Sequence, residues 1–420
     1  MTAYTIRGAR AADGEPVDLF VCNDVLVDEP APNAELVEAD GLLVLPGLVD
    51  LHTHLREPGL EDSETVASGT ACAARGGYTA VFAMANTDPV TDSPERARHI
   101  AELGRQANNA EVFPVGSITV GLVGEQLSPI AEMAAAGVRL FSDDGRCLMD
   151  SALMRQALEL AAETDTVIAQ HSQDHLLAGP DACVDERSVA GRLGLTGWPW
   201  VAESTIIARD VQLSELTGGR LHICHITTAE SVDVVRWAKA RGVPVSAEVT
   251  PHHLLLDSSL LSGLDTTFKV NPPLRGAGDI EALRAGLADG TIDIVGTDHA
   301  PHAAAAKRAA FPAAKPGMLG LEQALASVIE TMVNTGRMNW SDVVRVMSTV
   351  PAQIGRAGGH GRPLRPGQPA NLVLVDPDRR SMVDRERSAS ASRNNPYHGM
   401  DLPDPIEATM WAGRWTYRRT

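Results

Sequence analysis

The chain alternates short apolar runs with longer stretches of helical spacing, and this alternation constrains the fold more than any other feature. Eight apolar runs are rich in valine and isoleucine and bounded by turn residues, which is the pattern of buried parallel strands. Stretches such as PIAEMAAAG, SALMRQALELAAE and SVDVVRWAKARG lie between them. Alternating strands and helices form parallel sheets with right-handed crossovers. Eight such units between about residues 43 and 350 therefore predict a TIM-like (β/α)8 barrel.

Histidine and aspartate residues recur where the predicted strands end. The first run, GLLVLPGLVDLH, leads into a His-x-His pair, whose two side chains point to the same face of an extended segment. Active sites of such barrels lie at the carboxyl ends of the strands. The tips of predicted strands one, four, five, six and eight carry His52 and His54, Asp143 and Asp144, His171, His225, and Asp298. This distribution predicts a metal site at one rim of the barrel.

Both ends of the chain have a different pattern from the middle. The segments YTIRGA and DLFVCNDVLVDE near the start, and ANLVLVD and ATMWAGRWTYRR near the end, resemble short strands separated by turns. We predict that residues 1–45 and 355–420 together form a small β-sandwich domain, and that residues 46–354 form the barrel.

Composition limits the classes of function. The net charge of −18 argues against nucleic-acid or anionic-membrane partners, although an anionic substrate remains compatible with it. No apolar run reaches 18 residues, so no membrane span is expected. The five cysteines are scattered without a CxxC pair, and the N-terminus has no apolar signal core. These features favour reduced thiols in a cytoplasmic protein.

Several other residues have simpler interpretations. The alanine-rich stretch 302–317 follows strand eight and is interpreted as a mobile loop over the site, with a plain surface helix turn as the alternative. Arg275 and Lys269 are interpreted as balancing the acidic surface. Packing or supporting roles, rather than ligand roles, are expected for His222, His252, His253 and His299.

Longer motifs carry a family resemblance over nearly the whole chain, from LPGLVD to NNPYHG (394–399). The motifs are HTHLREPG (52–59), ANTDP (85–89), SDDG, HICHIT, EVTPHH (248–253), KVNPPLR (269–275) and GTDHAPH (296–302). By these motifs the chain resembles the dihydroorotase family of the amidohydrolase superfamily, and in particular its larger bacterial members with a barrel and a β domain.

The resemblance implies two metal ions. His52, His54 and Asp298 would hold the first, and His171 and His225 the second. Many relatives bridge the ions with a carboxylated lysine on strand four. The lysines here are Lys239, Lys269, Lys307 and Lys315, none of which lies on that strand, so an acidic residue must bridge. The resemblance favours Asp144 over Asp143. Imidazole and carboxylate ligands suit zinc, with manganese or cobalt as substitutes.

The resemblance also implies a reaction, the reversible cyclisation of N-carbamoyl-L-aspartate to L-dihydroorotate in pyrimidine biosynthesis. Asp298 would act as general base and then general acid. Arg56 would grip the substrate carboxylate in a bidentate manner. Lys315-Pro316-Gly317 departs from the Pro-Phe-Gly that is commoner in the family, which weakens the match there. The implied substrate contacts are His54, Arg56, Asn86, Asn271, His302, and the backbone of Pro316 and Gly317.

Two other functions stay open at this point. An allantoinase or hydantoinase-like enzyme would share the barrel and histidines, but it usually supplies the strand-four lysine. A non-catalytic scaffold for aspartate carbamoyltransferase predicts broken ligands, whereas all six candidate ligands are present. The sequence also leaves open whether the chain forms a homodimer or associates with that carbamoyltransferase.

Overall fold

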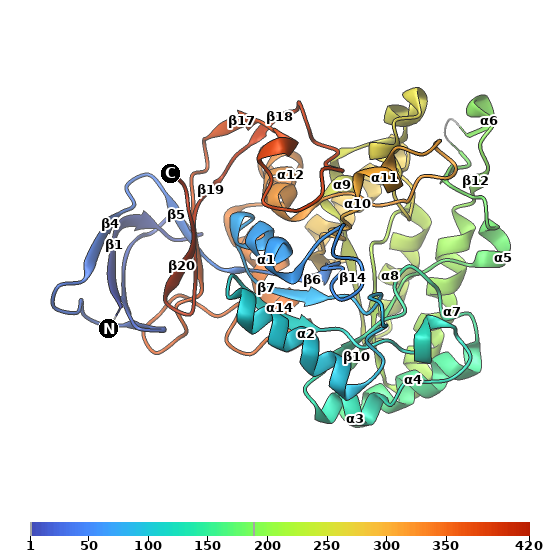
Figure 1. Cartoon of the computed structure of the whole chain (residues 1–420), viewed down its shortest axis with the longest axis horizontal. Coiled ribbons are helices and arrows are strands. Elements are labelled where there is room, and N and C mark those ends of the chain that lie inside the picture. Colours follow the sequence, from blue (N-terminus) through green and yellow to red (C-terminus); the bar gives the residue numbers. More distant parts are fainter. Residues whose placement is uncertain (1, 188–189) are drawn as a thin grey trace.

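The computed structural model describes residues 2–187 and 190–420. Its centre is a barrel of parallel strands, built from a three-stranded and a five-stranded sheet (Figure 1). Bridges from Gly116 to Phe141 and from Thr53 to His299 close the two seams. In spatial order the strands are β6 (Leu48–Thr53), β7 (Tyr78–Ala83), β8 (Glu111–Pro114), β9 (Leu140–Phe141), β10 (Val167–Gln170), β13 (Arg220–Ile223), β14 (Val245–Val249) and β15 (Ile294–Val295). The predicted barrel is confirmed.

Helices follow the barrel strands and cover the outside of the barrel. In α4, Asp150 accepts hydrogen bonds from the first-turn amides of Ala152 and Leu153, which fixes the start of the helix. Its buried residues recur at helical spacing and face the core. The covering helices are α1 (Val66–Arg75), α2 (Pro94–Ala107), α3 (Ile130–Ala135), α4 (Ser151–Thr164), α7 (Val201–Thr217), α8 (Ala229–Ala240), α10 (Ala277–Asp289), α12 (Ala324–Val328), α13 (Trp340–Val344) and α14 (Val350–Gly355).

Short elements occupy the loops around the barrel. They lie mainly between β10 and α7, after β14, after β15 and in the C-terminal segment. These elements are α5 (His175–Ala178), β11 (Val184–Asp185), α6 (Ala190–Leu193), β12 (Gly197–Trp198), α9 (Pro251–Leu255), α11 (Ala304–Lys307), β17 (Arg380–Met382) and β18 (Asp401–Pro403). Within the described part of the chain, no helix combines the length and apolar character needed to cross a membrane.

The first predicted strand, residues 41–52, is two strands in the structure. Its first half is β5 (Leu43–Pro46), which pairs with the C-terminal β16 (Leu372–Val375), and its second half is β6 of the barrel. The break falls at Gly47, where a Cβ atom would lie 2.3 Å from the Thr79 side chain. This close approach requires glycine. The break at Gly47 places the two halves of one apolar run in two different sheets.

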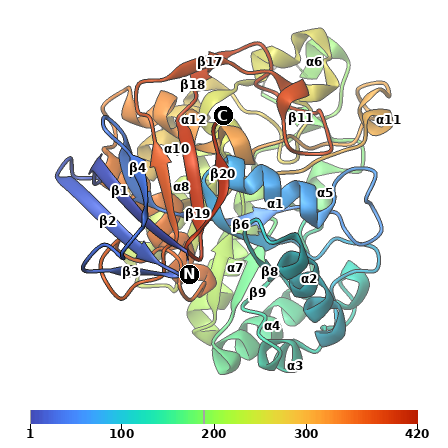
Figure 2. The ribbon, with the colours of Figure 1, turned by 60° about the vertical axis from the view of Figure 1, so that its left-hand side comes forward.

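Strands from both termini form one eight-stranded sheet beside the barrel (Figure 2). The sheet has a hydrophobic core of its own, which includes Ile6, Val21, Leu372 and Met410. A small β domain built from both chain ends is therefore present, while its exact boundaries stay a prediction. Besides β5 and β16, its strands are β1 (Ala3–Arg10), β2 (Pro16–Cys22), β3 (Val25–Val27), β4 (Glu35–Glu38), β19 (Ile406–Trp411) and β20 (Arg414–Arg418).

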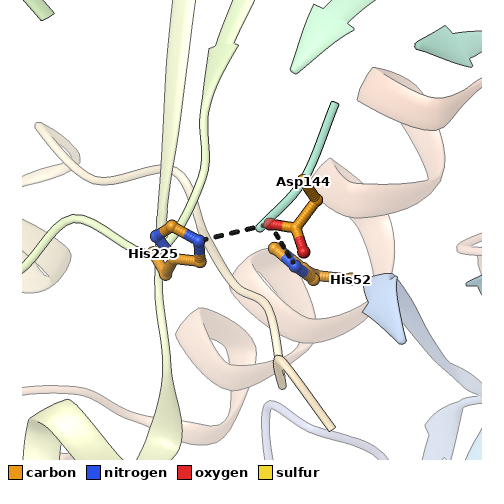
Figure 3. Close-up of side chains that lie close together, drawn as sticks. All are labelled: His52, Asp144 and His225. Carbon is orange, nitrogen blue, oxygen red and sulfur yellow. Dashed lines mark ion pairs between the residues drawn. The ribbon is translucent and has the colours of Figure 1, made fainter. Parts of the chain in front are cut away.

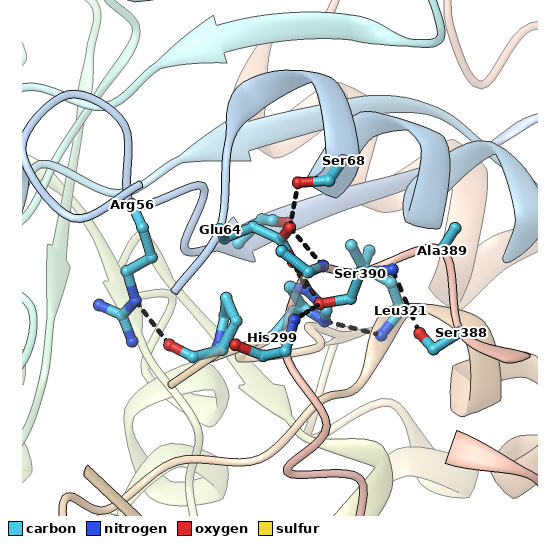
Figure 4. Close-up of polar contacts among 12 residues, drawn as sticks. Arg56, Glu64, Ser68, His299, Leu321, Ser388, Ala389 and Ser390 are labelled. Atoms are coloured by element: carbon cyan, nitrogen blue, oxygen red, sulfur yellow. Dashed lines mark hydrogen bonds and ion pairs between the residues drawn. The ribbon is translucent and has the colours of Figure 1, made fainter. Parts of the chain in front are cut away.

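β17 and β18 pair with each other outside the eight-stranded sheet, and the segment between them lies against the barrel. The Ser390 hydroxyl and the Ala391 amide both donate to the carboxylate of Glu64 in the loop after β6 (Figure 4). The Asn394 amide group donates to the carbonyl oxygens of Ala300, at 2.9 Å, and Gly317, at 3.1 Å. The segment between β17 and β18 thus hydrogen-bonds to the loop that follows β15 and helps to fix its position.

Candidate metal centre and active site

Asp144, just beyond β9, lies at the centre of a group of buried histidines. Its Oδ1 atom is 3.3 Å from Nε2 of His52 and 3.5 Å from Nε2 of His225, and its Oδ2 atom is 3.3 Å from Nε2 of His54 (Figure 3). His52 ends β6, His225 follows β13, and all of these side chains are buried. One carboxylate therefore faces imidazoles from two separate strand ends.

Asp298 and His171 complete the group around Asp144. Oδ1 of Asp298 lies 3.1 Å from Nε2 of His54 and 3.6 Å from Nε2 of His52. Nδ1 of His171 lies 2.9 Å from Nε2 of His225 and 3.5 Å from Oδ1 of Asp144. The structure thus brings all six predicted ligands together, from the tips of β6, β9, β10, β13 and β15.

The donor atoms suit a metal ion. His52, His54 and Asp298 each offer a ligand atom, and these atoms lie within 4.8 Å of one another; the same holds for His52, Asp144 and His225. Nε2 of His52 and Oδ1 of Asp144 are buried without a hydrogen-bond partner. Buried polar atoms are normally paired, so a cation among these atoms would supply the missing partner. The cluster can therefore hold metal.

Electrostatics keep the two carboxylates of the cluster charged. Burial alone would raise the pKa of Asp144, but His52, His171 and His225 outweigh it and hold this pKa well below its usual range. Burial likewise opposes ionisation of Asp298, and His54 and His52 reverse the effect, so its pKa is also lowered. Both side chains are therefore anionic at neutral pH, which is the form that binds metal.

Backbone geometry at the site is unusual. Arg56, His225 and Asp298 have positive φ angles of 62°, 32° and 42°, in a region that side chains other than glycine rarely adopt. Such residues are held in place by surrounding contacts and cluster at functional sites. Asp50 supplies one such contact, because its carboxylate accepts from the Thr297 amide at 2.8 Å and ties β6 to the residue before Asp298.

Asp143 is turned away from the cluster. Its Oδ1 atom accepts from the amides of Ile118, at 2.7 Å, and Thr119, at 3.0 Å, and its Oδ2 atom accepts from the Thr119 hydroxyl. The carboxylate thus fixes the loop after β8 to the tip of β9. Of the two neighbouring aspartates, only Asp144 faces the histidines.

Glu248 on β14 is a site residue that the sequence analysis did not find. Its Oε1 atom accepts from Nδ1 of His52 at 2.5 Å, and its Oε2 atom lies 3.2 Å from Nε2 of His222. A carboxylate that accepts from one ring nitrogen fixes the tautomer of a ligating histidine and leaves the other nitrogen for the metal. The sequence gives no signal for this, except that Glu248 is the one acidic residue within the run VPVSAEVT. His222 was expected to be a packing residue, and the structure adds this contact with Glu248.

Gln173 supports His171 in the same way and was also missed. Its Oε1 atom lies 3.0 Å from Nε2 of His171 and accepts from Nδ2 of Asn271 at 3.3 Å. With Nε2 of the ring donating to Gln173, Nδ1 is left facing Asp144. Gln173 and Asn271 also line a cavity of about 570 Å³ beside the cluster, together with Gly145, Lys269, Pro312 and Pro316.

Arg56 and Asn86 lie next to the cluster. The Arg56 side chain is buried and its Nε atom donates to the Pro301 carbonyl at 3.1 Å. Burial lowers the pKa of Arg56 to about 10, although Asp298 and Asp144 favour its charged form. Asn86 accepts from Nδ1 of His54 at 2.9 Å, so the structure gives it a part in orienting a predicted ligand.

Of the other predicted substrate contacts, Asn271 and Pro316 line the cavity beside the cluster, whereas His302 and Gly317 lie next to Pro316. Oδ1 of Asn271 is buried without a hydrogen-bond partner, whereas Nε2 of His302 donates to the Pro316 carbonyl at 2.7 Å. Burial and the neighbouring Arg56 lower the pKa of His302 to about 3, so its ring is neutral at pH 7.

Three other histidines near the site do not face Asp144. His299 turns to the far side of its strand, where Nε2 lies 3.4 Å from the Glu64 carboxylate and Nδ1 accepts from the Gly320 amide (Figure 4). Nε2 of His253 donates to the Pro272 carbonyl. Both ring nitrogens of His252 are buried without a hydrogen-bond partner, and burial lowers its pKa to about 4.

The surface roles expected for Arg275 and Lys269 are wrong. Arg275 is 1% exposed and donates to Asp185 at 2.9 Å, and its guanidinium lies over the Trp198 ring. Lys269 is 6% exposed and donates to main-chain carbonyls. Both cations are buried because internal acceptors satisfy them, and nothing in the local sequence places those acceptors.

Solved structures share this architecture. L-hydantoinase (dihydropyrimidinase) from Arthrobacter aurescens matches with a TM-score of 0.88 and 24% identity, over 100% of this chain and 96% of that one. Dihydropyrimidinase from Brevibacillus agri matches with a TM-score of 0.84 and 22% identity, over 99% and 95%. These likenesses establish the fold, a barrel joined to a small β domain.

The fold and the buried cluster define a barrel protein with a small β domain and a centre that can hold metal. A family profile described as "Dihydro-orotase-like" matches residues 41–231. The dihydroorotase of Leifsonia xyli is 53% identical over 98% of this chain and 95% of its own length. That of Streptomyces coelicolor is 52% identical over 99% and 98%. The chain belongs to the dihydroorotase family.

Proposed function

We propose that this protein is a metal-dependent dihydroorotase, which interconverts N-carbamoyl-L-aspartate and L-dihydroorotate in pyrimidine biosynthesis. The observation that carries the proposal is the convergence of six buried imidazole and carboxylate side chains, next to a buried arginine, in a member of this family. The Arg56 guanidinium suits both partners of this reaction, because dihydroorotate carries one carboxylate and N-carbamoyl-L-aspartate carries two. The overall charge of −18 does not prevent this, because the local charge at Arg56 governs binding.

The cluster would hold two ions, and we propose zinc, with manganese or cobalt as substitutes. His52, His54 and Asp298 would hold the first ion, and His171 and His225 the second. Asp144 would bridge them, because its two oxygens face histidines of both groups. When bound, a divalent metal lowers the pKa of water and polarises a carbonyl oxygen.

The side chains of the site would carry out proton transfer and substrate binding. Asp298, anionic and 3.1 Å from His54, would accept the proton of the attacking water and deliver it to the ring nitrogen as the amide bond breaks. In the cyclisation direction the same carboxylate would return the proton. Arg56 would hold the substrate carboxylate through its two terminal nitrogens. His54, Asn86, Asn271, His302 and the Pro316–Gly317 backbone would complete the proposed substrate contacts.

Ring opening of three substrates tests the function directly. The purified protein is incubated separately with dihydroorotate, allantoin and hydantoin, and ring opening of each is followed. Dihydroorotate is expected to react at least about 100-fold faster than the others, because they do not present its carboxylate to Arg56. Chelation is expected to remove activity and zinc to restore it. Faster opening of allantoin or hydantoin would contradict the proposal and favour the other amidohydrolase function.

Replacing Arg56 with methionine tests the carboxylate grip. The Arg56→Met variant is expected to raise KM for dihydroorotate by about 100-fold, because two charge-assisted hydrogen bonds are lost. Metal content, measured by elemental analysis, is expected to stay unchanged. Arg146→Met is the control, because Arg146 lines the cavity beside the cluster but is exposed, and it should change KM by less than about threefold. Equal loss of metal and binding in Arg56→Met would instead mean that Arg56 supports the metal centre.

A cytoplasmic location is part of the proposal and is supported by the cysteines, all five of which are free thiols. Homodimer formation and association with aspartate carbamoyltransferase are left open by the sequence. The mass of the native assembly, measured with and without that enzyme, tests both.

A further inference from the structure

The loop between α11 and Gly317 is held by a half-buried amine. Nζ of Lys307 lies 3.0 Å from the Lys315 carbonyl, 3.0 Å from the Gly317 carbonyl and 3.3 Å from the Lys269 carbonyl. Main-chain carbonyls from three points of the chain therefore surround this one side-chain nitrogen. The chain has only four lysines, and this one is placed inside the loop predicted to be mobile.

Lys269 holds the same loop from the opposite side. Its Nζ atom donates to the carbonyls of Phe311, at 2.9 Å, and Pro312, at 2.8 Å, and lies 5.6 Å from the centre of the Phe311 ring. Phe311 is 4% exposed. The two ammonium groups, together with this buried ring, give the segment 303–317 a fixed path; its mobility in solution stays a prediction.

Lys307 contacts the segment Lys315–Gly317, and this segment reaches the cavity beside the metal centre. Besides Lys307, the Gly317 carbonyl accepts from Asn394, and the Gly317 amide donates to the Lys269 carbonyl at 2.9 Å. Gly317 has a φ angle of 146°, and a Cβ atom there would lie 2.7 Å from Nε2 of His302. Pro316 itself lines the cavity. A shift of the segment Lys315–Gly317 would therefore move Pro316 and change the wall of the cavity that a substrate contacts.

We propose that Lys307 is a positioning residue, which sets Pro316 at the wall of the substrate cavity through its contacts with the Lys315 and Gly317 carbonyls on either side of that residue. The inference rests on the proposed function, because it takes this cavity as the substrate site. Burial and the neighbouring Lys269 lower the pKa of Lys307 to about 7, so the fold keeps this amine inside against a desolvation penalty. Lys315, on the same loop, has an exposed side chain and provides a matched comparison.

Steady-state kinetics of three variants test the role. Lys307→Met is expected to raise KM for dihydroorotate by about tenfold or more and to change kcat by less than about threefold, since a hydrogen bond to a charged group is lost without touching the metal ligands. Lys307→Arg, which keeps a charged donor, is expected to recover KM to within about threefold of the original. Lys315→Met, with the same change of charge, should leave KM unchanged.

Limited proteolysis supplies a readout that does not depend on activity. Trypsin cuts after Arg308, which lies exposed next to Lys307, and cleavage there is expected to be about tenfold faster in Lys307→Met than in Lys315→Met. An unchanged KM in Lys307→Met would overturn the positioning role, whether or not cleavage at Arg308 becomes faster. If Lys307→Met does not fold, Lys307→Gln gives the same comparison. An original protein that is inactive on dihydroorotate would instead reject the proposed function.

Discussion

Replacing Asp298 with alanine or asparagine is expected to reduce turnover of dihydroorotate by at least about 1,000-fold, within the range that a general acid–base group contributes. The carboxylate lies 3.1 Å from His54, and the surrounding histidines hold its pKa below the usual range, so it is ionised and ready to accept a proton at neutral pH. Single-turnover and steady-state rates at saturating substrate measure the loss.

Substrate binding should survive this change, because Arg56 contacts the Pro301 carbonyl and not Asp298. Isothermal titration with dihydroorotate measures the affinity, and elemental analysis measures the metal that remains. A variant with intact binding and normal turnover would reject the role of Asp298. A variant that loses metal in parallel with turnover would show that this side chain acts mainly as a ligand.

Asp144→Asn is expected to have the second large effect, on metal rather than on proton transfer. Asp144 is the only side chain whose oxygens approach histidines from β6, β10 and β13 within the described residues. Loss of its charge should weaken metal binding by more than about 100-fold. Replacing a residue that only supports a ligand already costs up to about 100-fold in metal affinity, and a direct ligand should contribute more. Metal stoichiometry after dialysis against a weak chelator checks this.

The neighbouring residue is the matched control. Asp143→Asn removes a carboxylate one position away, but that carboxylate accepts from Ile118 and Thr119 and faces away from the histidines. It is expected to lower the free energy of unfolding by about 2–3 kcal/mol, because amide donors lose a charged acceptor, while the metal content stays the same. Loss of metal in Asp143→Asn with retention in Asp144→Asn would reverse the assignment of the bridging ligand.

The barrel and the cluster of candidate ligands could be predicted because both depend on local patterns. Each apolar run ends in a polar residue, and in a parallel barrel all such ends meet at the same rim, so His52, His171 and Asp298 are placed together by topology alone. The alternation of strand and helix also excludes most other architectures. No knowledge of side-chain contacts is needed for either step.

The supporting residues could not be predicted in this way. Glu248 contacts His52 across 196 residues of sequence, from a strand that carries no candidate ligand. Gln173 follows His171 closely, but nothing in the sequence indicates which atom it faces. Lys269 and Arg275 have charged side chains that normally lie at the surface, and only the folded chain provides the acceptors that bury them. Such pairings depend on three-dimensional packing, which periodicity does not report.

The contacts that the C-terminal segment makes with the barrel bear on how the molecule can be divided. Ser390 and Asn394 come from beyond the predicted end of the barrel, yet they bond to Glu64 and to the Ala300 and Gly317 carbonyls. A fragment that stops at residue 354 would keep every candidate ligand but lose the braces of its own substrate wall. The segment between β17 and β18 therefore belongs to the structural unit of the barrel, and a truncation or domain exchange that removed it would also remove these contacts.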